Sequence, residues 1–183
     1  MEYFEIKDEI TPATVAAALA ALDEAVDGNE ITIQLPYNGG GSVDAAIWLI
    51  EAIKQTKASV TIEVDRYVIS AAAFIYLWFI IYPEAHVEAK TTGEPAILVY
   101  HRPRVIIEEH LAFLNDLNEQ TDEWETLKEF TEIFDKLFEY LMAACGYTAA
   151  NENIYEYSQC ALKHQLRHCR DGYYSNQDFV MPT

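Results

Sequence analysis

Three short segments carry residue types that could perform nucleophilic hydrolysis. Residues 38–43 (NGGGSV) hold three consecutive glycines, which permit positive φ angles and close approach of a backbone N–H to a ligand. Ser70 precedes a long apolar stretch, and His101 ends a short apolar run. A hydroxyl nucleophile, a histidine that titrates near neutrality and a pair of N–H groups are what acyl transfer needs. Each segment also has a purely structural explanation: a tight turn, a helix N-cap and a structural histidine.

The elements expected around these segments alternate between strands and helices. Hydrophobic periodicity and capping residues predict helices over 11–26, 42–54 and 70–82, and strands over 31–35, 59–64 and 96–100. Such alternation indicates a largely parallel sheet, and the three segments lie where strands end, which is where these sheets bind ligands. At the start of a helix, Ser70 would also lie beside free N–H groups that stabilise a developing oxyanion.

Beyond Pro103 the pattern becomes mostly helical. Helices are expected over 106–118, 123–144 and 151–168, followed by a turn at Asp171 and Gly172 and a short tail. A chain of 183 residues with no repeat or linker predicts one domain, 1–183. Within it we expect an α/β part over about 1–103, a helical segment over about 104–150, and a helix with a tail over 151–183.

The composition excludes some classes of partner. A formal net charge of −18 makes nucleic acid and anionic membranes poor partners, because both are bound through Lys and Arg. The uncharged run 67–82 is too short to span a bilayer and predicts buried core. Three cysteines and an acidic start without a leader pattern favour a reducing, cytoplasmic location.

In order and approximate spacing, three segments resemble the Clp protease proteolytic subunit (ClpP) family. They are 38–43, 66–73 (RYVISAAA) and 101–103 (HRP), and the resemblance covers roughly 31–104. It implies an α/β fold of the ClpP/crotonase type, with βαβ repeats, a largely parallel sheet and, here, an enlarged helical C-terminal third with a handle-like segment. It also implies a serine endopeptidase that hydrolyses unfolded polypeptides inside an oligomeric chamber.

The resemblance assigns roles to individual residues. Ser70 would be the nucleophile, His101 the general base, and Asp171, from the segment 171–178 (DGYYSNQD), the residue that orients His101. The oxyanion donors would be the N–H groups of Gly40 and Ala71, and the substrate loop would include Gly41 and Ser42, with Gly41 as the fallback donor.

Three departures from the family pattern are visible. Arg66 stands where the family usually has glycine, and Gly39 stands where it usually has proline. The interval between His101 and Asp171 is also about 20 residues longer than is usual in the family. The first two flank the site, so they bear on the shape of the pocket.

The resemblance also implies partners. We expect peptide or unfolded protein substrates, self-association into rings that are commonly heptameric and stacked, and an AAA+ unfoldase as a possible partner. No cofactor and no metal are expected. Apolar rows in the helical segment, which a single small domain would not bury alone, favour the same self-association.

Four alternatives remain open. The chain could be an inactive ClpP-like scaffold or interaction subunit, or a crotonase relative acting on acyl-CoA, although it lacks an evident basic cluster for the phosphates. A Ser-Lys dyad would need Lys54, Lys57 or Lys90 in place of His101. A zinc site at Cys160, His164 and His168 is disfavoured, because three such residues along one helix span about 12 Å.

Overall fold

The computed structural model describes residues 1–147 and 157–183, which form two compact units. Unit 1 comprises Met1–Tyr100 and Val180–Thr183, and unit 2 comprises His101–Phe179. The boundary therefore falls immediately before His101, close to residue 103, where the sequence predicted the end of the α/β part. The expectation of a single domain stays a prediction.

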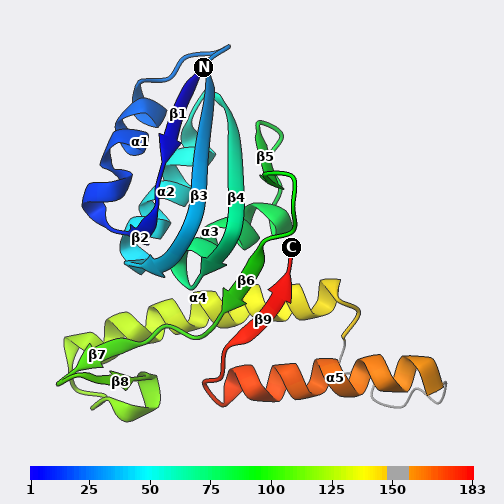
Figure 1. The fold of residues 1–183 in the computed structure, drawn as a ribbon. Coiled ribbons are helices and arrows are strands. Elements are labelled where there is room, and N and C mark those ends of the chain that lie inside the picture. Colours follow the sequence, from blue (N-terminus) through cyan, green and yellow to red (C-terminus); the bar gives the residue numbers. More distant parts are fainter. Residues whose placement is uncertain (148–156) are drawn as a thin grey trace. The chain divides into compact units, whose positions relative to one another are not determined.

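Unit 1 is built on a mostly parallel sheet, which confirms the predicted α/β class (Figure 1). The strands run in the order β1-β3-β4-β6-β9, and β2 also pairs with β3 and β5 with β4. Pairings among β1 to β6 are parallel. The bounds are β1 Glu2–Glu5, β2 Asp8–Ile10, β3 Glu30–Gly41, β4 Ser59–Ile69, β5 Val87–Thr91, β6 Ile97–Tyr100 and β9 Phe179–Pro182.

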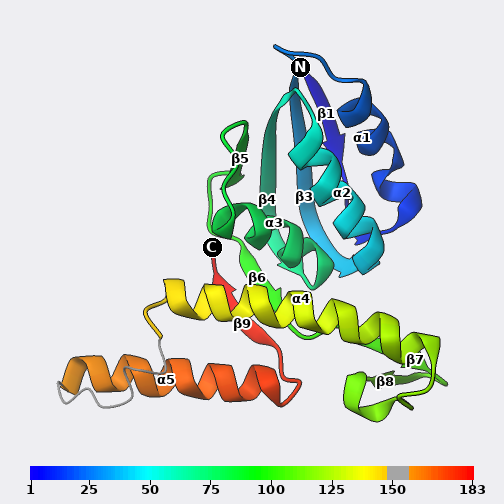
Figure 2. The ribbon, with the colours of Figure 1, turned by 180° about the vertical axis from the view of Figure 1, so that it is seen from behind.

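Three helices of unit 1 begin where the sequence predicted. α1 (Pro12–Glu24) starts with a capping box in which Thr11 and Thr14 satisfy each other's backbone N–H groups. α2 (Val43–Gln55) starts where the Ser42 hydroxyl accepts from the Ala45 N–H at 3.2 Å. α3 (Ala71–Ile81) is apolar on all sides and buried over most of its length. Figure 2 shows α1 and α2 in front of β1, β3 and β4, so these two helices cover one face of the sheet.

β3 and β4 are longer than predicted, because both continue through a bulge. The sequence predicted a break from Pro36 to Gly41, but the register runs from Pro36 opposite Asp65 to Asn38 opposite Val68. β4 thus holds one more residue than β3 over this interval, and the extra residue is accommodated by positive φ angles of 48° at Tyr37 and 64° at Arg66. The ladder resumes beyond the bulge, so the predicted glycine loop is the end of a strand.

The bulge explains why a glycine would suit position 66, and it yields a stability prediction. A residue with a Cβ at φ 64° carries a steric cost that glycine avoids. The Arg66 side chain contributes little stability that would offset this cost, since the N–O distance of its surface ion pair with Asp65 is 3.8 Å. We expect Arg66→Gly to be more stable than Arg66→Ala by about 0.5–1 kcal/mol in urea unfolding. Both variants lose the same ion pair, so equal stabilities would contradict strain at this position.

In unit 2 the first helix predicted beyond Pro103 is absent. Instead of a helix over 106–118, the chain forms a hairpin of β7 (Val105–Ile107) and β8 (His110–Ala112), followed by the short 3-10 helix η1 (Leu114–Asp116). The β-branched residues of β7 favour a strand. Glu108 and Glu109 both have positive φ, 48° and 67°, as a two-residue hairpin turn requires.

Two helices complete unit 2. α4 (Asp122–Ala144) confirms the predicted helix and buries one row of side chains, including Leu127, Phe134 and Phe138. α5 (Tyr157–Tyr174) confirms part of the third predicted helix, whose residues 151–156 lie outside the described residues. Within the ranges described, no helix has the length and apolar character that crossing a membrane requires.

Candidate active site

Ser70 occupies a strained turn between β4 and α3. Its φ and ψ are 55° and −119°, a combination that a residue with a Cβ rarely adopts. Its N–H donates to the Val99 carbonyl at 2.9 Å and its carbonyl accepts from the Phe74 N–H at 2.8 Å. Ser70 is the N-cap residue of α3, as the structural explanation predicted, but its hydroxyl makes no capping hydrogen bond. A sharp strand-to-helix turn that presents a free hydroxyl is the arrangement used by nucleophilic serines in α/β-hydrolases.

The sequence after Ser70 permits this sharp turn. Ala71, Ala72 and Ala73 are fully buried, so the first turn of α3 begins inside the core without large side chains. The register of β4 against β6 places Ile69 opposite Val99, which explains the bond from the Ser70 N–H. The turn is therefore fixed at both ends by regular structure.

Gly40 is packed directly against the Ser70 turn. Its φ is 91°, and a Cβ added to it would lie 2.6 Å from both the Ser70 Cβ and the Ile69 carbonyl oxygen, and 3.1 Å from the Ala71 nitrogen. Both the backbone angle and the close approach thus require glycine. The structure brings together three of the predicted site residues: Gly40, Ser70 and Ala71.

The two predicted oxyanion donors differ in their availability. Ala71 is the first residue of α3, where N–H groups have no intrahelical acceptor, and it has no other acceptor among the described residues. The Gly40 N–H instead donates to the Asn38 side-chain oxygen at 2.9 Å. Asn38 is fully buried, and its amide nitrogen donates to the Ile6 carbonyl at 2.8 Å. Asn38 is a residue whose role the sequence reasoning missed, although a buried Asn before a glycine run is a signal for such a bond.

The substrate-loop residues Gly41 and Ser42 lie at the junction of β3 and α2. Gly41 is opposite Ile10 of β2, and its φ of 131° and contact with the Ile10 carbonyl oxygen leave no space for a Cβ. The Ser42 N–H donates to the same carbonyl at 2.8 Å, while its hydroxyl caps α2. Both residues hold the end of β3 against neighbouring elements.

His101 is the first residue of unit 2, and it is buried. Its Nδ1 lies 2.7 Å from the Arg102 carbonyl oxygen. Burial lowers the pKa of His101 below its ordinary value of 6.5. The bond to the Arg102 carbonyl and the charge of Asp178 raise this pKa, and the charge of Arg104 lowers it. The imidazole is therefore neutral near pH 7, the form that can accept a proton.

Asp171, the predicted orienting residue, is exposed in the last turn of α5. The predicted turn at Asp171 and Gly172 is wrong, because α5 continues to Tyr174 and ends where Asn176 adopts a φ of 62°. The continuation has a packing reason: Tyr173 is buried and stacks on Phe138, with ring centroids 3.7 Å apart.

Asp178 is the carboxylate whose charge acts on His101 within unit 2. It also forms an ion pair with Arg104 at 3.6 Å. The segment 171–178 thus contains two aspartates, and no sequence signal favoured the second over the first.

Comparison with protein-family models found no match for this chain, and comparison with curated proteins found none either. The assignment of roles therefore depends on the geometry described above and on the resemblance of the three segments.

The zinc alternative has no support among the residues with described side chains, where no cluster of three or more His, Cys, Asp or Glu could hold a metal ion. The side chain of Cys160 lies outside the described residues, while His164 and His168 lie on α5.

The environment of His101 gives a prediction for its titration. We expect the imidazole of the native protein to titrate below pH 6.5, because burial disfavours the charged form. Asp178→Asn should lower the midpoint further, since it removes a charge that favours the imidazolium, and Arg104→Ala should raise it. Proton NMR of the imidazole C2 hydrogen, assigned with His101→Gln, measures the midpoint. Asp171→Asn serves as the control, and a midpoint that rises in Asp178→Asn would contradict the assigned electrostatics.

Proposed function

We propose that this protein is a ClpP-like serine endopeptidase that hydrolyses peptide bonds in unfolded polypeptides. The single observation that carries the proposal is the strained Ser70 turn, with its hydroxyl uncapped and the Gly40 backbone packed against it. Strain of this kind persists only where the surrounding structure enforces it, and it gathers at active sites. The order of the glycine segment, Ser70 and His101, together with the resemblance, supplies the reaction.

The proposed reaction has two steps. The Ser70 Oγ attacks the peptide carbonyl carbon while His101 Nε2 takes the hydroxyl proton; the C–N bond then breaks, and the leaving amine receives that proton. Water next attacks the acyl-serine ester, again with His101 as base, and releases the new carboxylic acid and the free Ser70 hydroxyl. The uncharged imidazole that burial favours suits the first proton transfer.

The oxyanion formed in each step needs N–H donors. The Ala71 N–H suits this role, because it has no acceptor in the described ranges and lies at the positive end of α3. Gly40 is the second donor in the proposal, and its N–H would exchange the Asn38 side-chain oxygen for the substrate oxyanion. Asn38→Ala would remove the side-chain oxygen that accepts from the Gly40 N–H, so this N–H would become available. The same variant would remove the amide that donates to the Ile6 carbonyl.

The proposed mechanism also needs a partner that orients His101. The resemblance assigns this role to Asp171, whereas the Nδ1 partner within unit 2 is the Arg102 carbonyl oxygen. The proposal requires only that Nε2 be free to take the proton from Ser70.

The proposal includes the expected assembly into rings and an unfoldase that feeds the chamber. The hairpin of β7 and β8 exposes large apolar side chains, with Ile106 76% and Leu111 54% exposed. Exposed apolar groups of this size favour association.

An inactive ClpP-like scaffold is the second candidate. The observation that favours it is the hydrogen bond from the Gly40 N–H to Asn38, which leaves one of the two oxyanion donors occupied. Ring assembly alone would need neither this donor nor a reactive serine.

Labelling with a serine-reactive fluorophosphonate separates the two candidates. For a peptidase we expect a single covalent adduct, which mass spectrometry of the digested protein maps to Ser70, together with slow cleavage of short unstructured peptides. A protein that neither labels nor cleaves peptides would instead favour the scaffold.

A further inference from the structure

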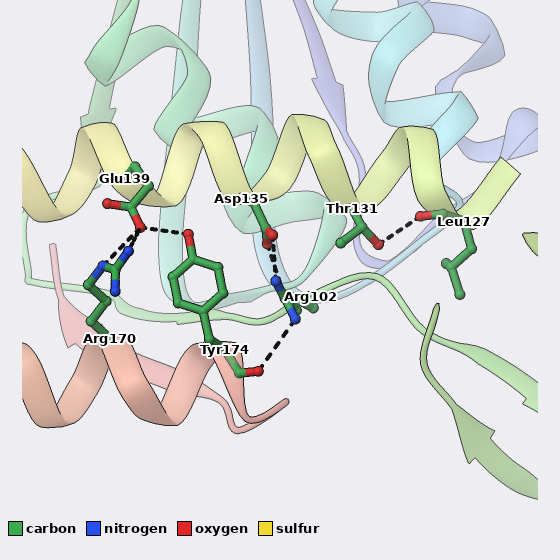
Figure 3. A network of polar contacts seen from close by, with 7 residues as sticks. All are labelled: Arg102, Leu127, Thr131, Asp135, Glu139, Arg170 and Tyr174. Atoms are coloured by element: carbon green, nitrogen blue, oxygen red, sulfur yellow. Dashed lines mark hydrogen bonds and ion pairs between the residues drawn. The ribbon is translucent and has the colours of Figure 1, made fainter. Parts of the chain in front are cut away.

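Figure 3 shows a network of polar contacts in unit 2 that includes three hydrogen bonds of Arg102. Its guanidinium donates from Nε and Nη2 to the two carboxylate oxygens of Asp135, at 2.9 and 2.6 Å, and from Nη1 to the Tyr174 carbonyl at 3.4 Å. Two parallel hydrogen bonds of this kind fix the plane of the guanidinium as well as its position.

Aromatic rings hold the same guanidinium from a second direction. Its central carbon lies 4.7 Å from the centroid of the Tyr174 ring and 5.8 Å from that of Tyr173. Tyr173 is itself buried and stacked on Phe138 of α4. Arg102 is therefore clamped by groups from both α4 and α5.

The clamped residue is also the hydrogen-bond partner of His101. The His101 Nδ1 lies 2.7 Å from the Arg102 carbonyl oxygen, which has no hydrogen and can only accept. A bond at this distance therefore requires the hydrogen of the neutral imidazole to be on Nδ1, which leaves Nε2 as the acceptor.

Pro103 restricts the backbone that carries this carbonyl. A residue before proline is confined to extended conformations, because the proline ring clashes with other arrangements of its backbone. Pro103 is buried as well, so the peptide between Arg102 and Pro103 is fixed on one side by the ring and on the other by the guanidinium clamp.

We propose that Arg102 is a positioning residue: its carbonyl oxygen, held in place by the Asp135 clamp and by Pro103, fixes His101 in the tautomer with Nδ1 protonated and Nε2 free. This inference rests on the proposed function for its catalytic meaning, since Nε2 is the atom that takes the Ser70 proton. A backbone carbonyl thereby performs the orienting role that the resemblance gives to Asp171. The Arg102 side chain acts on the reaction only through His101.

The tautomer is directly measurable. Nitrogen-15 NMR of protein labelled in its histidines distinguishes a protonated from an unprotonated ring nitrogen, and His101→Gln identifies the signals of His101. In the wild type above pH 7 we expect Nδ1 protonated and Nε2 not. The opposite tautomer, with Nε2 protonated and Nδ1 unprotonated, would overturn the inference. This test uses the wild type alone, so it does not depend on whether a variant folds.

Two variants test the clamp. Asp135→Asn weakens the bond pair to Arg102, and Arg102→Lys removes the planar fork while keeping a positive charge. In both we expect the Nδ1-protonated signature to be lost in favour of a mixture of tautomers. Where activity is present, kcat should fall by at least about tenfold, and by no more than the roughly 10,000-fold that a general base contributes at most. Unchanged tautomers in both variants would contradict a role for the clamp.

Matched controls separate positioning from folding. Thr131→Val removes a different buried hydrogen bond of α4, from the Thr131 hydroxyl to the Leu127 carbonyl at 2.7 Å, and should leave the His101 tautomer unchanged. Asp171→Asn should also leave it unchanged, and a tautomer that depends on Asp171 instead would overturn the inference. The NMR readout needs no hydrolysis. A protein with the expected tautomer but no Ser70 labelling would thus refute the proposed peptidase and leave the positioning intact.

Discussion

Ser70→Ala is expected to abolish fluorophosphonate labelling and to lower peptide hydrolysis by at least about 1,000-fold, since removal of a nucleophile leaves only binding and oxyanion stabilisation. The protein should remain folded, because the Ser70 hydroxyl makes no capping bond and alanine keeps the same backbone strain. Labelling yield and initial hydrolysis rates measure the first effect, and urea unfolding measures the second.

Two further variants make this prediction specific. Ser70→Gly should be inactive and more stable than Ser70→Ala, because glycine adopts a φ of 55° without the steric cost. Ser59→Ala is the control serine: it lies at the opposite end of the same strand and is exposed, so it should retain full activity. Hydrolysis that persists without Ser70 would remove the basis of the proposed mechanism.

Gly40→Ala is expected to destabilise the protein by about 2–5 kcal/mol, the combination of a Cβ at positive φ and overpacking against fixed backbone. The added Cβ would fall 2.6 Å from the Ile69 carbonyl oxygen and from the Ser70 Cβ, and neither can move without shifting the strand-to-helix turn. Any protein that remains folded should also lose Ser70 labelling, because the turn that presents the hydroxyl would be displaced.

Gly28→Ala is a matched control for this variant. Gly28 has nearly the same φ, 88° against 91°, but a Cβ added there would meet nothing within 4 Å. It should therefore cost only the backbone strain, about 1–2 kcal/mol. Equal losses of unfolding free energy in the two variants would contradict the close contact between Gly40 and the Ser70 turn.

Local sequence signals sufficed for the elements that present Ser70. The caps at Thr11 and Ser42 and the apolar run after Ser70 fixed the starts of α1, α2 and α3, and the parallel sheet followed from their alternation with strands. The sequence also indicated that Gly40 could approach another group closely, because a glycine after a strand permits both a positive φ and a close contact; the structure shows that this group is the Ser70 turn.

Other features depend on contacts that no local pattern reveals. The backbone angles of Ser70 are imposed by the bonds to Val99 and Phe74, since serine itself has no preference for them. The hairpin of β7 and β8 was predicted as a helix because its short apolar run is compatible with both the helical and the strand periodicity. Its turn also lacks the usual sequence signal, since it uses two glutamates instead of Asn or Gly. The clamp on Arg102 joins it to Asp135, 33 positions away, so the pairing of these two residues was not visible in the sequence.

The pairing of β6 has a consequence for local unfolding. β4 is registered with β6 at only three residue pairs, Tyr67–Ile97, Val68–Leu98 and Ile69–Val99, whereas its ladder with β3 extends from Glu30 to Asn38. The short ladder is the weaker of the two, so it can open while the central strands stay paired. Opening would expose the Ser70 amide to exchange with solvent and would free the strand that leads into His101. Amide exchange at Ser70 thus reports how often the proposed catalytic arrangement is lost in a molecule that is still folded.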